Sequence, residues 1–207
     1  MHHPSIPAHR ERNLMSHIEL PAANVVADAS KVILDGIKGD SQFPAFRAAS
    51  LEYSDDWQCF TGFPVVANWH LETDAAPLFE EGLRALALKA AVYALTHDDQ
   101  TAEIPIAVPV DELTHAMLAQ AQLLTRIADA RGISIIHQTD QEHTDYRAGG
   151  YTHDCYRLAW GEPPARYWLD HEEVVRRRGV LAGLYQSIGM GRSGREHALD
   201  FAEPVAV

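Results

Sequence analysis

The sequence has only two cysteines, Cys59 and Cys155, which lie nearly a hundred residues apart. Small secreted proteins that depend on disulfides carry more cysteines at closer spacing, and a cysteine-based zinc site needs a closely spaced pair. Both classes are therefore excluded. We interpret Cys59 and Cys155 as two reduced, buried thiols.

Positive charge is also scarce. Lysine occurs only at positions 31, 38 and 89, and 17 basic residues stand against 29 acidic ones, so the formal net charge is −12. The densest basic run is 176–178. Phosphate binding relies on clustered lysine and arginine, so nucleic acid is a poor candidate partner. The charge balance instead favours a protein partner with a basic surface.

The chain lacks any run of the roughly 18 apolar residues that a membrane span requires, and its first 15 residues are polar, unlike a signal peptide. We therefore expect a soluble, cytoplasmic protein that does not enter a membrane. The expected organisation is a flexible extension over 1–14, one α+β domain over 15–189, and a loosely held tail over 190–207.

Apolar residues at steps of three and four predict four helices, over 24–38, 78–95, 111–131 and 170–188. Gly39, Gly132 and Gly189 follow three of them, as glycine commonly does at a helix end. The second predicted helix is apolar on most of its circumference, which indicates a central position.

Other segments show the features of strands. Residues 63–71 alternate apolar and polar side chains, with 57–60 as a hairpin partner. Residues 133–137 and 151–160 are predicted as a second strand pair, and the proline-containing segment 104–110 as an edge strand or an extended linker. Together these elements predict an α+β fold in which an antiparallel or mixed sheet, built from strand pairs, packs against about four helices.

The highest density of metal-binding residue types lies between 137 and 171. Imidazole and carboxylate are the natural ligands of zinc, iron and manganese, and a loop between two strands can gather several of them. The candidate ligands are His137, His143, Asp145 and His153. His70 and Glu72 are a second candidate pair, on the polar face of the 63–71 strand. The alternative reading of both sets is an ordinary solvated surface.

Catalytic motifs fail in their context. Residues 189–194 spell G-x-G-x-x-G, but a predicted helix precedes them where a dinucleotide site needs a strand, and no nucleophile elbow occurs. Tyrosines flank the acidic loop, and tyrosine is favoured at interfaces. The leading hypothesis is therefore a noncatalytic accessory protein without a cofactor, which binds another protein through Glu142, Tyr146 and Tyr151. The alternative is a small hydrolase or oxygenase that holds one zinc, iron or manganese ion between 137 and 154.

Overall fold

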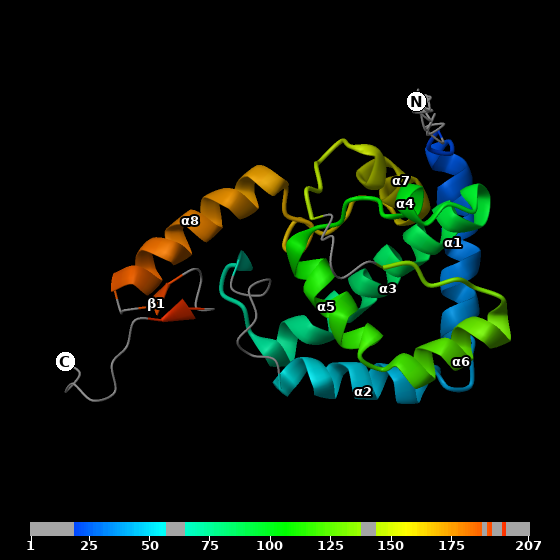
Figure 1. Cartoon of the computed structure of the whole chain (residues 1–207), viewed down its shortest axis with the longest axis horizontal. Coiled ribbons are helices and arrows are strands. Elements are labelled where there is room, and N and C mark those ends of the chain that lie inside the picture. Colours follow the sequence, from blue (N-terminus) through cyan, green and yellow to red (C-terminus); the bar gives the residue numbers. More distant parts are fainter. Residues whose placement is uncertain (1–18, 57–64, 138–143, 188–189, 192–195, 198–207) are drawn as a thin grey trace, which may run out of the picture.

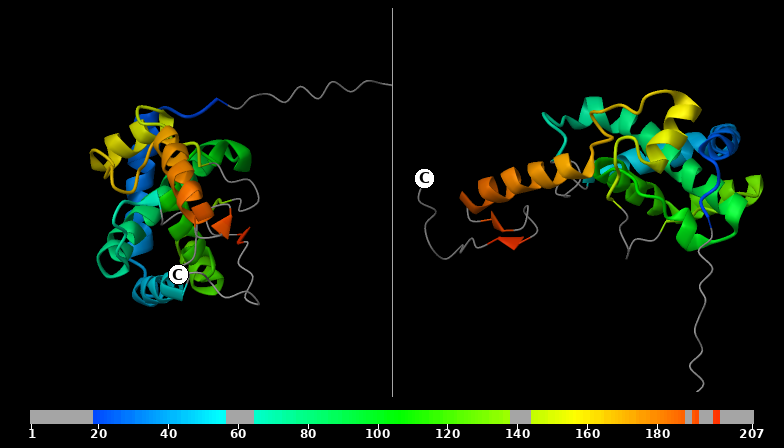
Figure 2. Two further views of the ribbon diagram at one scale, coloured as in Figure 1. Left: turned by 90° about the vertical axis from the view of Figure 1, so that its left-hand side faces the viewer. Right: turned by 90° about the horizontal axis from the view of Figure 1, so that it is seen from above.

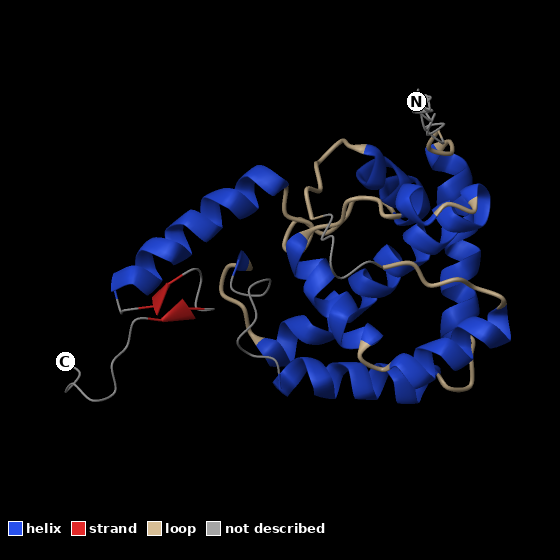
Figure 3. Ribbon diagram, viewed as in Figure 1, coloured by secondary structure: helices blue, strands red, loops and turns tan. Residues whose placement is uncertain are grey.

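The structure is a computed structural model, and it describes residues 19–56, 65–137, 144–187, 190–191 and 196–197. In these ranges the chain forms eight helices and two very short strands. The helices are α1 (Ala23–Lys38), α2 (Phe43–Asp56), α3 (Leu71–Thr96), α4 (Asp99–Ala102), α5 (Val108–Leu118), α6 (Ala121–Arg131), α7 (Tyr151–Trp160) and α8 (His171–Ser187). The strands β1 (Met190–Gly191) and β2 (Glu196–His197) pair antiparallel (Figure 3).

Helix α3 is the centre of the helical body, and α1 and α5 pack along it (Figure 1). Its side chains are buried on most of its circumference, as the mainly apolar stretch 83–92, interrupted only by Arg84 and Lys89, predicts. Gly82 allows the close approach of α5, because a Cβ atom there would lie 2.8 Å from the Cε atom of Met117. The expectation of a central helix over 78–95 is confirmed.

Helix α8 extends away from this body toward β1 (Figure 2). Val174 anchors its first turn in a small apolar cluster with Val65, Val108 and Leu169. No helix among the described residues is long and apolar enough to cross a membrane.

The α+β expectation is wrong, because the described chain is helical apart from the two-residue strands β1 and β2. Segment 151–160, expected as a strand, is helix α7. Thr152, Cys155 and Tyr156 are its buried residues, and their spacing of three and four positions is the helical period. Gly161, with φ of +86°, ends the helix. The aromatic and apolar content of this segment is compatible with a strand or a helix. The spacing of its buried residues is that of a helix.

The other expected strands fail for local reasons. In segment 63–71, the consecutive residues Val65 and Val66 are both buried, which contradicts alternation, and Asn68 has φ of +49°. Leu71 already begins α3. Segment 104–110 is extended only as far as Ala107, and residues 133–137 run without a strand partner in the described chain. The expected hairpin strand 57–60 lies outside the described residues.

The remaining expected helices are confirmed in position, but one of them is divided into two helices, and one further helix was not expected. The 111–131 segment forms two helices, α5 and α6, because the chain turns at Ala119 and Gln120. Helix α2 was not expected; it buries Phe46 and Ser50, which lie four residues apart. Glycine 132, with φ of +63°, ends α6 as predicted.

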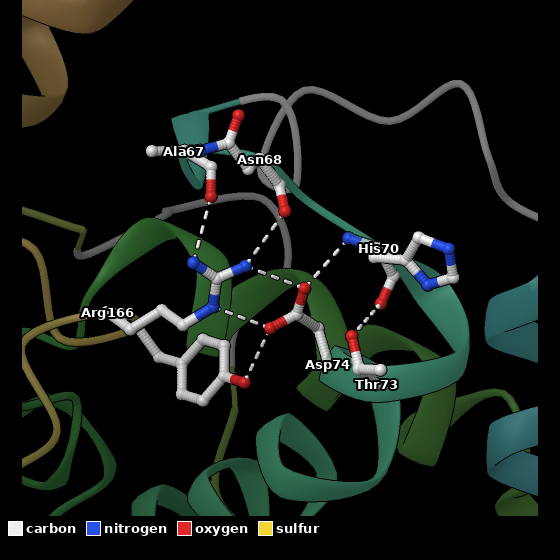
Figure 4. Close-up of polar contacts among 7 residues, drawn as sticks. Ala67, Asn68, His70, Thr73, Asp74 and Arg166 are labelled. Atoms are coloured by element: carbon white, nitrogen blue, oxygen red, sulfur yellow. Dashed lines mark hydrogen bonds and ion pairs between the residues drawn. The ribbon is translucent and has the colours of Figure 1, made fainter.

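A polar clamp joins the start of α3 to the turn before α8 (Figure 4). The Arg166 guanidinium donates to both carboxylate oxygens of Asp74 at 2.6 and 2.8 Å, and also to the main-chain oxygens of Ala67 and Asn68. The Tyr167 hydroxyl donates to the same carboxylate at 2.8 Å. These bonds, the Arg166 side-chain bond first, lower the pKa of Asp74 to about 2. The clamp fixes the segment that was expected to be a strand.

His70 and Glu72, the second candidate pair, lie at this helix start. The His70 main-chain N–H donates to Asp74, and its carbonyl accepts from Thr73. The side chains of His70 and Glu72 are both exposed. They therefore belong to a helix N-terminus, and the sheet face on which they were expected to lie does not exist.

Candidate metal site

Five titratable side chains gather where α3, α5 and the extended segment 133–137 meet. Lys89 on α3 and Glu103, which follows α4, form the innermost pair, with side chains only 2% and 1% exposed. A buried charge is tolerated when it is paired and hydrogen-bonded, and here the ammonium donates to the carboxylate. The pair places one positive and one negative charge inside the helical body.

Helix α5 contributes two side chains to the same region. Asp111 lies in its first turn and His115 one turn later, and residues four apart share a helix face. The His115 Nε2 atom is 3.6 Å from the Asp111 Oδ2 atom. The Asp111 side chain is 7% exposed and the His115 side chain 20%, so His115 forms the outer edge of the group.

His137 completes the group from the end of the extended segment. Its side chain is 2% exposed, and its Nε2 atom lies 3.7 Å from the Asp111 Oδ1 atom. Its ring stands edge-on to that of His115, with 5.1 Å between ring centroids. On the other side of the ring, the Nδ1 atom lies 3.4 Å from the Lys89 Nζ atom.

Three potential ligand atoms thus converge on one point. One atom each from Asp111, His115 and His137 all lie within 4.8 Å of one another. The Nε2 atoms of both histidines are buried and have no hydrogen-bond partner among the described residues. Metal–nitrogen and metal–oxygen bonds of about 2.0–2.2 Å place tetrahedral ligand atoms roughly 3.3 Å apart. The observed 3.6 and 3.7 Å separations involve different oxygen atoms of Asp111, so the three side chains would need small rotations to reach that geometry around one ion.

The electrostatics favour a cation. Burial, then the charge of Lys89 and the ring of His115, lowers the pKa of His137 to about 3, so its imidazole is neutral near pH 7. Neutral imidazole is the form that binds metals. Because Glu103 balances Lys89, the Asp111 carboxylate leaves the five side chains with a formal charge of −1 when both imidazoles are neutral.

The structure separates the candidate metal ligands of the acidic loop where it describes them. His137 belongs to the group above, whereas Asp145 is exposed. The Nδ1 atom of His153 lies 2.7 Å from the Tyr146 hydroxyl, and its Nε2 atom is 3.6 Å from Glu162. His143 lies outside the described residues. The metal site expected at His137, His143, Asp145 and His153 therefore stays a prediction. Of these residues, His137 lies beside other potential metal ligands, Asp111 and His115.

The candidate protein-binding residues also have described positions, except Glu142, which lies outside the described residues. Tyr146 is 2% exposed and packs edge-on against Trp168 at 5.1 Å between ring centroids. Burial raises the pKa of Tyr146 to about 12. Tyr151 donates its hydroxyl hydrogen to the Pro21 carbonyl at 2.7 Å. Both tyrosines thus make intramolecular contacts, and the proposed protein-binding surface stays a prediction.

Asp111 and His115 are not among the candidate ligands expected from the sequence, because both lie outside the histidine-rich stretch 137–171. The available signal was a carboxylate and an imidazole four residues apart on a predicted helix, which is a spacing that brings two ligands to one ion. Their approach to His137 depends on tertiary structure.

Comparison of the chain with protein-family models, with curated proteins and with solved structures finds no match in any of the three.

Proposed function

We propose that this protein binds one divalent transition-metal ion through Asp111, His115 and His137 and uses it to activate a water molecule or a substrate. The observation that carries the proposal is the convergence of two buried, unpaired imidazole Nε2 atoms on one buried carboxylate. A buried polar atom without a partner is costly unless something else satisfies it, and one metal ion would satisfy both imidazole nitrogens at once.

The ligand set suggests which ions and which chemistry. Two imidazoles and one carboxylate suit zinc, iron and manganese, the ions expected from the sequence. Structural zinc sites are closed by four protein ligands, whereas three ligands leave a position for water or substrate. The side chain of His115 is partly exposed, so solvent could reach an ion held by these residues. This arrangement supports a metal-dependent hydrolase or oxygenase.

Lys89 constrains how the ion is bound. An ammonium group only donates hydrogen bonds, so its contact with the His137 Nδ1 atom places a lone pair there and the ring proton on Nε2. Coordination through Nε2 requires the proton to move to Nδ1 and the Lys89–His137 contact to end. Lys89 retains its bond to Glu103 in either state. Metal binding therefore exchanges one weak 3.4 Å contact for a coordination bond.

The test is a cobalt titration of the full-length, metal-free protein, because tetrahedral or five-coordinate cobalt absorbs visible light, followed by competition with zinc. The variants Asp111→Asn, His115→Gln and His137→Gln each remove one ligand with little change of volume. His153→Gln and Asp145→Asn are the matched controls, since they alter the same residue types outside the group of Asp111, His115 and His137.

We expect one ion per chain and an affinity at least 100-fold weaker in each of the three ligand variants, with both controls like the wild type. Circular dichroism of every variant establishes that it is folded. Absence of binding by the folded wild type contradicts the proposal. Binding that is lost in His153→Gln and Asp145→Asn but kept in the other three variants places the ion near His153 and Asp145. That result also contradicts the proposal.

A further inference from the structure

A separate pocket of about 430 Å³ opens beside the C-terminal half of α3. Its apolar part includes Ile33 of α1 and Ile133, which follows α6. Its polar part includes Tyr93, His97, Arg131 and Ser134. The lining thus offers apolar and polar groups in similar shares, which suits a small molecule that has both an apolar and a polar part.

The charge of the lining differs from that of the whole chain. The protein carries a formal net charge of −12. None of the described residues that line this pocket is acidic, and one of them, Arg131, is basic. The Arg131 Nη2 atom donates to the Gly39 carbonyl at 2.8 Å and its Nε atom to Asp40 at 3.2 Å. Among the described residues these bonds use the Nε and Nη2 atoms, and they orient the guanidinium before a ligand arrives.

His97 adds a second donor at the edge of the pocket. It ends α3 in the left-handed conformation, with φ of +55°, where glycine or asparagine is the usual residue. Its ring stands edge-on to Tyr93, with 6.1 Å between ring centroids. Histidine is among the non-glycine residues that adopt this conformation most often, and here the helix end places its ring at the pocket.

We propose that this pocket binds a small organic anion, a carboxylate with a short apolar body, with the carboxylate at Arg131 and His97 and the apolar body against Ile33 and Ile133. Guanidinium and carboxylate form strong charge-assisted hydrogen bonds, and the side chains of Ile33 and Ile133 offer apolar contacts to the body of the ligand. The proposal goes beyond metal binding and does not depend on it, because the pocket lining and the metal ligands share no residue.

The experiment compares hexanoate, hexylammonium and 1-hexanol, which share one apolar chain and differ in the head group. Amide chemical shifts of the isotope-labelled full-length protein are followed at Gly132 and Ser134 during each titration. Ala94→Trp fills the pocket from an exposed position, and Arg131→Gln removes the charge. The matched controls are Ala119→Trp and Arg126→Gln, which lie at exposed positions outside the pocket.

We expect hexanoate to shift both amides in a saturable way, with at least 10-fold weaker binding of hexanol and no binding of hexylammonium. Ala94→Trp and Arg131→Gln should each weaken hexanoate binding at least 10-fold, while the controls match the wild type. Equal binding of the three compounds overturns the anion assignment. Absence of any saturable shift, or full retention of binding in Ala94→Trp, overturns the pocket as the site.

Discussion

The burial of His137 predicts a specific dependence of stability on pH. The pKa of this imidazole is about 3 in the folded protein, against an ordinary value near 6.5 in the unfolded chain. Above pH 6.5 both states hold the ring neutral, so the group adds no pH dependence. Between pH 6.5 and 3 only the unfolded state takes up the proton, so stability falls as the pH falls.

The magnitude follows from the two pKa values. Each pH unit well below 6.5 lowers the free energy of unfolding by about 1.4 kcal/mol, which gives about 2.7 kcal/mol between neutral pH and pH 4.5. A loss of this size is a large part of the 5–15 kcal/mol that stabilises a typical domain. His137→Gln keeps a neutral polar side chain of similar size and removes the titration.

Urea unfolding of the metal-free protein at pH 7.5, 6.5, 5.5 and 4.5 measures this effect. The wild type should lose about 2.7 kcal/mol more than His137→Gln across that range, because all other titrating groups are common to both. His153→Gln, whose side chain is also partly buried, controls for the removal of a histidine. Parallel curves for the wild type and His137→Gln refute the argument that His137 is held neutral by burial.

Three further outcomes follow from other contacts. Asp74→Asn breaks the clamp with Arg166 and should lower the free energy of unfolding by about 2 kcal/mol, measured with urea at pH 7. Because the pKa of Asp74 is lowered to about 2, the stability advantage of the wild type is present above pH 4 and should shrink as the pH falls through 2. Burial raises the pKa of the Cys155 thiol to about 11, so iodoacetamide at pH 8 should label it at least 100-fold more slowly in the folded than in the unfolded protein. Mass spectrometry of the peptide that contains Cys155 measures both rates, and equal rates contradict the burial of the thiol. His97→Gly relieves the left-handed strain and should keep or raise the melting temperature, and a loss of several degrees would show that the ring stabilises the helix end.

The helices that the sequence predicted well are those whose buried residues follow one clear stripe or a mainly apolar stretch. The 24–38 and 78–95 predictions correspond to α1 and α3 because hydrophobic period and glycine or polar ends agree there. Segment 151–160 failed because its aromatic residues resemble a strand, while its buried positions keep the helical period. The same pattern of residues is compatible with both periods until the packing partner is known.

The candidate site was predictable only in part. His137 was recognised as a ligand type, but its neighbours Asp111 and Lys89 lie 26 and 48 positions away along the chain, and no local pattern reports such contacts. The burial of Tyr146 likewise depends on tertiary packing, because its ring lies against Trp168, and the sequence around it does not report that contact. Local periodicity identifies elements, whereas the site arises from the way α3, α5 and residues 133–137 meet.

The most direct test of the central claim is an anomalous-scattering map from crystals of the full-length protein grown with zinc. If the proposed site is occupied, the map should show one strong peak about 2.0–2.2 Å from an Asp111 carboxylate oxygen and from the Nε2 atoms of His115 and His137. The His137 ring should then no longer accept from Lys89. No peak between these three side chains, at a zinc concentration that saturates the protein in solution, would contradict the account.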